Sequence, residues 1–441
     1  MARVSPISGF PEFLPQQRIV EQQVVDTLRH VFELHGFTPI QTRAIEPVDE
    51  LARKGEITKE VYTVRRIHAS GDEPDEWGLH YDLTVPFARY VVENAGKLNF
   101  PLRRYQIQPC WRGERPQEGR YREFWQADID VVGQNTLATH HEAEVVLVML
   151  EAWERLHSEI GLPVALTQAS NRKLLQGFYA GIGVADPLAA IQVVDKLGKI
   201  GEAGGGEILT AQGLSASQVG AILSLATIHS DGVGFVDQVR SLGVTNSLVE
   251  EGLDELATLV SAGQSRFPGR IVADLRIARG LDYYTGCVFE TVLPDYPALP
   301  SVSGGGRYDA LAVDGVTTYP GVGISLGITR LLAPLLAKDK VKASRSVPSA
   351  VLVAVDDEPA RGDAESVATH LRARDISCEV APKADKYGKQ IRYADRRGIP
   401  YVWFGGVEGE VKDIRTGEQV AVDARTWTPP QEDLTPAIVW A

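Results

Sequence analysis

Within residues 122–132, apolar and polar side chains alternate from Trp125 to Val131, and no other stretch constrains the fold as much. The apolar side chains would share one face of an extended chain, namely Trp125, Ala127, Ile129 and Val131. The polar side chains would share the opposite face, beside Phe124, namely Gln126, Asp128 and Asp130. The pattern predicts a β-strand. That strand lies either at the half-solvated edge of a sheet or in a cleft where its polar face meets a ligand.

Amphipathic helices are predicted on both sides of this strand, over residues 16–35 and 139–161. Apolar residues recur there at the helical period. Pro15 and Gly36 stand where a first-turn proline and a C-terminal glycine belong, and Thr139 and Glu142 have the spacing of a capping box. Further strands are predicted over 105–111, 271–277 and 281–292, so the region mixes helices with a sheet.

The remaining segments suggest separate domains. Residues 166–265 contain helical fragments such as 215–229 and a glycine stretch, 204–206, that we expect to be flexible. A charged linker is predicted up to residue 348. Beyond it strands at 350–355, 377–381 and 400–404 alternate with helices at 363–374 and 387–397, the order of a small α/β domain. We therefore divide the chain into 1–165, 166–265, 266–337 and 348–441.

Composition excludes several classes of protein. The 441 residues carry a formal net charge of −13, so general coating of nucleic acid is not expected. The three cysteines form no CxxC pair, and the nine histidines show no HExxH or HxH spacing, so we predict no metal site on protein ligands. No signal peptide or apolar run of membrane-spanning length is present, and we expect a cytoplasmic protein without a membrane partner.

Six arginines crowd the segment 103–122, and three glutamates oppose them, namely Glu114, Glu118 and Glu123. Such a cluster is commonly a solvated surface. Here, however, Arg112 ends a predicted strand and Arg120 and Arg122 open the next, so arginines would stand at both ends of a hairpin loop. Guanidinium groups bind phosphate oxygens in bidentate fashion, and the hairpin therefore suits a polyphosphate.

Two glycine-rich segments are weaker signals. Residues 303–307 (SGGGR) read most simply as a tight turn, without the lysine and hydroxyl of a Walker A loop. Residues 321–327 (GVGISLG) miss the dinucleotide fingerprint by one position, and no βαβ unit follows, so we reject a Rossmann site. Residues 279–286 (RGLDYYTG) place an arginine and two tyrosines at a predicted strand start. They indicate either a ligand site or a buried tyrosine pair.

Taken together, these motifs resemble the histidyl-tRNA synthetase family of class II aminoacyl-tRNA synthetases. Residues 112–116 (RGERP) with 119–124 (GRYREF) resemble motif 2, and 321–330 resemble motif 3. Residues 279–286 and 303–309 are similar to the two histidine signatures, 81–86 (YDLTVP) to the amino-acid loop, and 195–197 (DKL) to the insertion domain. The chain departs from the pattern at Arg43, where motif 1 normally has proline, and at Thr329, where motif 3 normally has glutamate.

The resemblance implies an α+β fold: an antiparallel class II sheet flanked by helices, a helical insertion domain and a C-terminal α/β anticodon-binding domain. It implies a homodimer whose partners are L-histidine, ATP and histidine tRNA. Histidine would attack the α-phosphorus of ATP to give histidyl-adenylate and pyrophosphate. The 3′-terminal ribose of the tRNA would then take the histidyl group. ATP is a substrate here, and Mg²⁺ is expected to accompany it.

The resemblance also implies roles around ATP. Arg112 would hold the α-phosphate, and Arg279 would lie across it and stabilise charge that develops in the transition state. These two arginines are the predicted catalytic residues. Glu114 would read the adenine amino group, Arg330 would stack on the adenine ring, and Arg120 would also contact ATP.

Imidazole chemistry sets the requirements of the amino-acid pocket. A neutral imidazole offers one donor and one acceptor, so a selective pocket needs a carboxylate opposite a hydroxyl. Asp130 would supply the carboxylate, and the pair Tyr283 and Tyr284 the hydroxyl. By resemblance, the α-amino group would be held by three further residues, namely Asp82, Thr84 and Gln126.

The C-terminal part carries a local basic patch, with six Lys or Arg against two Asp over residues 383–397. That is the expected footprint of RNA backbone contact. One alternative is a catalytically inactive synthetase-like subunit that regulates ATP phosphoribosyltransferase, a class that lacks the anticodon-binding domain. Another is a synthetase-like enzyme that modifies a protein or carrier.

Overall fold

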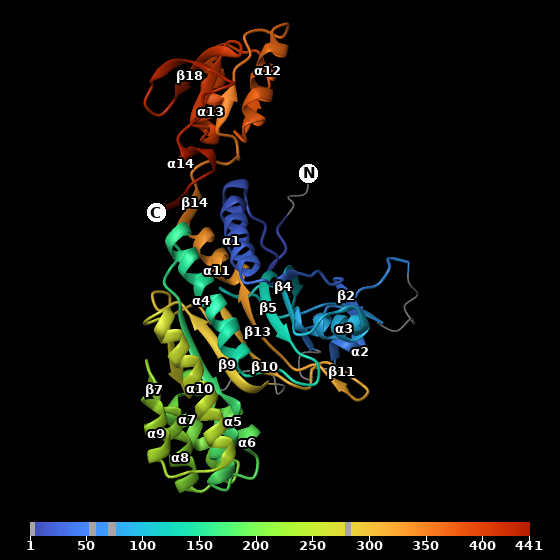
Figure 1. The fold of residues 1–441 in the computed structure, drawn as a ribbon, viewed down its shortest axis with the longest axis vertical. Coiled ribbons are helices and arrows are strands. Elements are labelled where there is room, and N and C mark those ends of the chain that lie inside the picture. The colour runs from blue at the N-terminus through green and yellow to red at the C-terminus, as the bar shows by residue number, and fades with distance from the viewer. Residues whose placement is uncertain (1–4, 53–58, 69–75, 278–283) are drawn as a thin grey trace. The chain divides into compact units, whose positions relative to one another are not determined.

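A computed structural model of the chain describes residues 5–52, 59–68, 76–277 and 284–441 (Figure 1). It divides into two compact units. The first comprises Met1–Pro11 and Val24–Pro334, and the second comprises Glu12–Gln23 and Leu335–Ala441. Each is described by itself. In the described part of the chain no helix is long and apolar enough to cross a membrane.

A nine-stranded sheet, counted over the described residues, forms the centre of the first unit. Its spatial order is β1 (Thr38–Pro39), β4 (Leu102–Trp111), β5 (Glu123–Val132), β13 (Gly321–Gly327), β10 (Ser303–Tyr308), β9 (Tyr284–Val292), β6 (Leu166–Asn171), β8 (Ile271–Asp274) and β7 (His229–Ser230). Neighbours from β4 to β6 are all antiparallel. The predicted strand 122–132 is β5, and it lies inside the sheet between β4 and β13, so the edge-strand interpretation is wrong.

Helices cover the apolar face of this sheet. Ala127, Ile129 and Val131 are fully buried on β5, and α4 (His140–Ile160) contacts both β5 and β13. The predicted capping box of α4 is wrong: the Thr139 side chain makes no cap bond. Glu142 instead accepts the backbone N–H of Cys287 at 2.8 Å, which ties the start of α4 to β9. The other predicted helix is α1 (Pro15–Leu34).

A small hairpin and two helices complete the amino-terminal half of this unit: β2 (Ile45–Pro47), α2 (Val48–Ala52), β3 (Trp77–Leu79) and α3 (Thr84–Asn94). Glu46 is completely buried in this region. Arg43 donates to it at 2.9 Å and Arg89 at 2.6 Å. Arg43, the departure from motif 1, is therefore accommodated by an ion pair with Glu46.

Between β6 and β8 the chain is mostly helical: α5 (Arg172–Gly181), α6 (Pro187–Val194), α7 (Leu197–Ala211), α8 (Ala216–Ala226), α9 (Phe235–Ser241) and α10 (Ser247–Arg266) (Figure 1). The glycines 204–206, where we expected a flexible stretch, lie within the helix α7. Helices α5 and α10 approach very closely: a Cβ on Gly252 would lie 2.4 Å from the backbone nitrogen of Leu174. Asn171 caps α5 through the N–H groups of Lys173 and Leu174.

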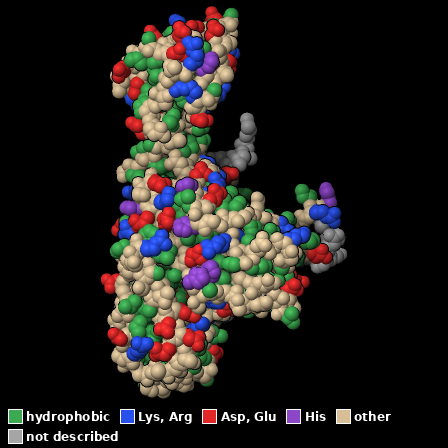
Figure 2. Space-filling model, in the orientation of Figure 1, with side chains coloured by type: hydrophobic (Ala, Val, Ile, Leu, Met, Phe, Trp, Pro, Cys, Tyr) green, Lys and Arg blue, Asp and Glu red, His purple; other side chains and the backbone are tan. Residues whose placement is uncertain are grey.

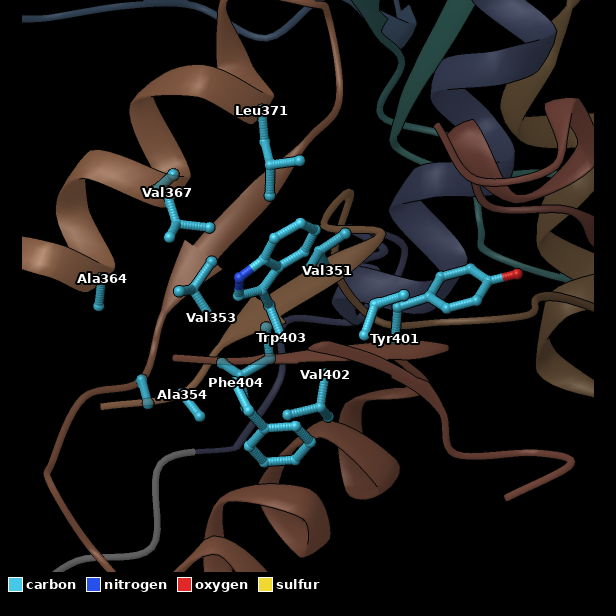
Figure 3. Packing of buried hydrophobic residues seen from close by; sticks show 14 of the residues in the cluster. Val351, Val353, Ala354, Ala364, Val367, Leu371, Tyr401, Val402, Trp403 and Phe404 are labelled. Carbon is cyan, nitrogen blue, oxygen red and sulfur yellow. The ribbon is translucent and has the colours of Figure 1, made fainter. Parts of the chain in front are cut away.

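The second unit contains a five-stranded sheet, ordered β16 (Cys378–Val380), β15 (Val351–Val353), β17 (Tyr401–Phe404), β18 (Glu408–Asp413) and β19 (Gln419–Asp423). Helices α12 (Arg361–Arg372) and α13 (Tyr387–Arg397) follow β15 and β16, in the predicted α/β alternation. Trp403 is fully buried at the centre of the core, near Val353 and Leu371 (Figure 3). The predicted linker contains strand β14 (Val341–Ala343), which pairs with β20 (Ile438–Trp440).

Candidate active site

The polar face of β5 forms the floor of a small cleft. On this face Gln126, Asp128 and Asp130 follow one another at every second residue. The cleft is lined by residues from α3, β5, β9, β10 and β13, namely Thr84, Asp128, Asp130, Tyr284, Gly304, Gly305, Gly306, Tyr308, Gly323, Ile324 and Ser325. The topology thus brings together several of the residues predicted to bind histidine.

Asp130 is held on both sides. Its carboxylate is only 3% exposed and accepts the Tyr308 hydroxyl at 2.8 Å. Its other oxygen lies 2.7 Å from the guanidinium of Arg104, which is completely buried and lies over the Phe87 ring at 4.2 Å. A carboxylate has about four lone-pair sites, so Asp130 retains capacity for one more donor.

The two partners of Asp130, Arg104 and Tyr308, were not predicted as site residues from the sequence. Arg104 belongs to the arginine cluster, but strand pairing places it directly opposite Asp130 across β4 and β5. Tyr308 belongs to the second signature and stands on β10, two residues beyond Gly306. The period-two pattern of both strands is the signal that could have assigned Arg104 and Tyr308 to the face of Asp130.

Glycines give this cleft its shape, and residues 303–307 form strand β10 where a tight turn was expected. A Cβ on Gly323 would lie 2.1 Å from the Asp130 carboxylate, and one on Gly305 would lie 2.0 Å from the Gly323 carbonyl oxygen. A Cβ on Gly306 would lie 3.0 Å from the Tyr284 ring. These contacts require glycine because backbone and side chains occupy the space of any larger residue.

Asp128 is the least satisfied carboxylate of the cleft. It is 3% exposed and hydrogen-bonds to Ser325, but its Oδ1 has no hydrogen-bond partner in the described part of the chain. Burial raises the pKa of the Asp128 carboxyl to about 7; the Arg104 guanidinium opposes this rise, and the nearby carboxylates of Asp130 and Asp82 add to it. Asp128 was not among the site residues predicted from the sequence.

The predicted α-amino ligands lie around one end of β5. Asp82 is 8% exposed and accepts the backbone N–H of Val85, at the start of α3. Thr84 is the first residue of that helix and lines the cleft. Gln126 donates to the Ser325 hydroxyl at 2.7 Å, and its carbonyl oxygen has no hydrogen-bond partner among the described residues.

The motif 2 residues lie in and beside the loop that joins β4 to β5. Arg112 follows β4 directly, donates from Nε to the Tyr81 carbonyl at 3.0 Å and lies over the Phe124 ring at 5.0 Å. Arg120 and Glu114 face each other with 3.7 Å between their charged groups. Both side chains of this pair are partly exposed, so the pair offers one carboxylate and one guanidinium group to solvent.

The motif 3 residues fasten this loop to the sheet. Arg330, in α11 (Ile328–Ala337), donates to the Gly119 carbonyl at 2.9 Å and to the Ser301 carbonyl at 2.8 Å. Thr329, the departure from the motif, accepts the backbone N–H of Trp125 at 2.8 Å. The hydroxyl therefore satisfies a backbone donor at the start of β5. Arg279 and Tyr283 lie outside the described residues.

Two groups of described side chains have atoms close enough to share a metal ion. His141 and Glu144 are in contact at 2.6 Å, with His140 beside them. In the second group Glu142 and Glu255 lie near Cys287, but Lys173 already donates to Glu255 at 2.6 Å. Existing partners thus occupy both groups, and the absence of a protein-bound metal stays a prediction.

The sequence profile of the family described as histidyl-tRNA synthetase matches residues 9–331, and the anticodon binding domain matches residues 349–425. The chain belongs to the histidyl-tRNA synthetase family. The family and the α+β fold class predicted from the sequence are therefore confirmed.

Relatives support this membership over the whole length. The histidine–tRNA ligase of Cutibacterium acnes is 57% identical over 451 residues and covers 100% of this chain and 99% of its own. That of Micrococcus luteus is 52% identical and covers 100% of both chains. The crystal structure of histidyl-tRNA synthetase from a Nostoc species has a TM-score of 0.84 at 32% identity and covers 96% of this chain and 98% of that chain.

The second unit carries the basic patch of residues 383–397. Five of its six cations are exposed, namely Lys383, Lys386, Lys389, Arg392 and Arg396. Four of these cations, Lys383, Lys389, Arg392 and Arg396, border a hollow of about 520 Å³ at α13 that also includes Tyr393. Lys or Arg and Asp or Glu side chains are otherwise interspersed over the face seen in Figure 2. The hollow therefore combines local positive charge with an aromatic ring.

The raised pKa of Asp128 makes a prediction about stability. An unfolded Asp has a pKa near 3.9, so the native chain holds the Asp128 proton more tightly. The protonated Asp128 carboxyl stabilises the native chain fully below about pH 4, and this stabilisation is lost as the pH rises to about 7. The Asp128→Asn variant has no such group and does not lose stability in this way. The free energy of unfolding of the variant relative to wild type should therefore increase by about 2–3 kcal/mol between pH 5 and pH 8.

Thermal and urea unfolding at the two pH values measure this difference. Asp254→Asn, at an exposed position on α10, serves as the control and should show the same small effect at both pH values. An equal effect of Asp128→Asn at pH 5 and pH 8 would contradict the prediction, because it would show that Asp128 does not titrate in this range.

Proposed function

We propose that this chain is a histidine–tRNA ligase, which activates histidine with ATP and transfers the histidyl group to the 3′ end of histidine tRNA. The observation that carries the proposal is full-length family membership combined with a buried acceptor cleft beside the motif 2 arginines. The match to an anticodon binding domain over 349–425 disfavours the regulatory-subunit alternative, which lacks that domain.

The proposed ATP site is the hairpin between β4 and β5 with the start of α11. Nε of Arg112 is occupied by the Tyr81 carbonyl, which fixes the guanidinium beside the cleft, where its other N–H groups would bind the α-phosphate. Arg330 is held by two backbone carbonyls and would present its flat face to adenine. Glu114 would read the adenine amino group, and Arg120 would contact ATP from across their ion pair.

The proposed histidine site is the floor of the cleft. Asp130 would accept the imidazole N–H, and its contact with Arg104 at 2.7 Å supports this role because it holds the buried side chain at the floor of the cleft. Tyr284, with Tyr283, would face the other ring nitrogen. Asp82, Thr84 and Gln126 would hold the α-amino group, and the unpartnered carbonyl oxygen of Gln126 suits such a donor.

The first reaction asks little covalent chemistry of the protein. Phosphoryl and adenylyl transfers depend mainly on positioning and on compensation of charge. Arg112 would bind the α-phosphate from one side and Arg279 from the other. Mg²⁺ would arrive with ATP, coordinated largely by phosphate oxygens and water, and would neutralise charge on the pyrophosphate leaving group.

The partners of the whole chain complete the proposal. The basic hollow along α13 would contact the backbone of histidine tRNA. A homodimer and a cytoplasmic location are proposed from family membership. Histidine-dependent exchange between ATP and pyrophosphate, followed by charging of histidine tRNA, tests the ligase function. Absence of exchange in the intact, folded chain would contradict it.

Arg279 is the first residue to test. Arg279→Ala removes a donor aimed at charge that develops in the transition state, so adenylate formation should fall by roughly 10²–10³-fold. Pyrophosphate exchange measures this step, and a thermal melt identical to wild type shows that the fold is intact. Exchange close to the wild-type rate would remove Arg279 from the proposed machinery.

Asp130→Asn tests whether Asp130 binds the imidazole ring of histidine. The change keeps the size of the side chain but converts one acceptor oxygen to a donor, so histidine binding should weaken by about 1–3 kcal/mol. The KM for histidine should rise, while the KM for ATP should change little because Arg112 and Arg279 remain. Steady-state exchange kinetics measure both constants. Equal rises in the two would place the ring elsewhere.

Charge reversal on α13 tests the proposed tRNA surface. Replacing Lys389, Arg392 and Arg396 with glutamate should impair tRNA charging strongly at low salt and make it less dependent on salt, while pyrophosphate exchange is spared. The matched control replaces three exposed lysines elsewhere in the same unit, Lys338, Lys340 and Lys342, with glutamate. Equal loss of charging in both variants would mean that the effect follows net charge and is not specific to α13.

A further inference from the structure

Asp128 is a buried carboxylate in the cleft that the family resemblance leaves without a role. It lies between Gln126 and Asp130 on the polar face of β5, opposite Gln106 on β4 and Ser325 on β13. It lines the cleft together with Thr84 and other residues proposed to touch histidine. A carboxylate at this depth carries a large desolvation cost unless a partner compensates it.

Some acceptor oxygens on the floor of the cleft have a hydrogen-bond donor and others do not. Both oxygens of Asp130 have partners, in Tyr308 and Arg104. On the polar face of β5, by contrast, two buried acceptor atoms have no hydrogen-bond partner among the described residues: Oδ1 of Asp128 and the side-chain oxygen of Gln126. These two residues are neighbours on one strand face. Unpaired acceptors call for a ligand that brings hydrogen-bond donors.

The charged groups near Asp128 also favour a ligand that carries a positive charge. Three charged groups lie close enough to Asp128 to affect its pKa. They are Arg104 on β4, Asp130 on β5 and Asp82 in the turn before α3. Cys110 on β4 is also close, and burial raises the pKa of its thiol, so it stays neutral. Tyr284 and Tyr308 line the cleft from β9 and β10, and β13 adds only the Ser325 hydroxyl. One buried arginine thus faces three carboxylates.

We propose that Asp128 accepts a hydrogen bond from the α-ammonium group of histidine, beside Gln126, and supplies the negative charge that this cation requires. The inference rests on the proposed function and adds a specificity residue to it. An ammonium group has three donors, so it satisfies the free oxygens of Asp128 and Gln126 together. The imidazole ring remains with Asp130.

A proton balance follows from this arrangement. Without ligand, burial and the neighbouring carboxylates raise the pKa of Asp128 to about 7, so below that pH most molecules carry the neutral acid. Binding of the ammonium favours the ionised carboxylate, and the Asp128 proton leaves to solvent. The ligand keeps its own ammonium proton. Binding should therefore release protons below pH 7 and tighten as pH rises towards 8.

A matched pair of ligands isolates this interaction. Histidinol carries the imidazole ring and the ammonium, and 3-(imidazol-4-yl)propan-1-ol is the same molecule without the amino group. Binding of each is measured by calorimetry on the full chain at pH 8. Asp128→Asn should weaken histidinol by about 10- to 100-fold, the range for a hydrogen bond to a charged group, and the des-amino compound by less than about 3-fold.

Asp130→Asn is the control, and it should weaken both ligands by a similar factor because both carry the ring. If Asp128→Asn weakens both ligands equally, or neither, the assignment of the ammonium to Asp128 is overturned. A wild-type chain that shows no histidine-dependent pyrophosphate exchange would instead overturn the proposed function, which keeps the two failures distinct.

A second measurement uses the unaltered chain and does not depend on how the variant folds. At pH 6.5, calorimetry in buffers of different ionisation enthalpy counts the protons released on binding. Each free ligand is first titrated on its own, because the ammonium group lowers the ring pKa of histidinol below that of the des-amino compound. After this ring contribution is subtracted, histidinol should release more protons, since only its ammonium meets Asp128. Equal corrected proton release by the two ligands would overturn the proposal.

Discussion

The buried ion pair between Arg104 and Asp130 fixes the floor on which the rest of the cleft is built. Both side chains lie in the sheet, on directly paired positions of β4 and β5. Removing one partner of such a pair commonly costs about 3–5 kcal/mol, because the other charge stays buried. The pair therefore holds the two strands in register, and Tyr308 ties the same carboxylate to β10.

The glycines of β10 and β13 follow from this constraint. With Asp130 held in place, no side chain fits at Gly323, and none fits at Gly305 without striking the Gly323 carbonyl. Two central strands thus present bare backbone to the cleft. A small polar substrate can lie against the sheet there. Helix α4 covers the opposite, apolar face of β5, where hydrophobic packing stabilises the strand.

The sequence predicted secondary structure correctly where the hydrophobic residues followed a single clear period, either that of a strand or that of a helix. The alternation at 122–132 predicted both faces of β5, and helical spacing predicted α1 and α4, because burial of one face selects the register. It failed where tertiary contacts override local preference. Glu142 leaves the predicted capping box to bind the Cys287 N–H, and the glycines 204–206 continue a helix. Arg104 and Asp128 were missed as site residues because their importance depends on pairing across strands.

Asp128 shows how such a site balances stability and binding. Burial near two other carboxylates disfavours its charged form, so the carboxylate lowers the stability of the native chain above pH 7. Asparagine would remove that cost, and it would also remove the negative charge. A cation bound at this position recovers the lost electrostatic energy only in the complex. A group that destabilises the free protein in this way favours a cationic substrate over an equally shaped neutral one, because only the cation relieves the unfavourable charge.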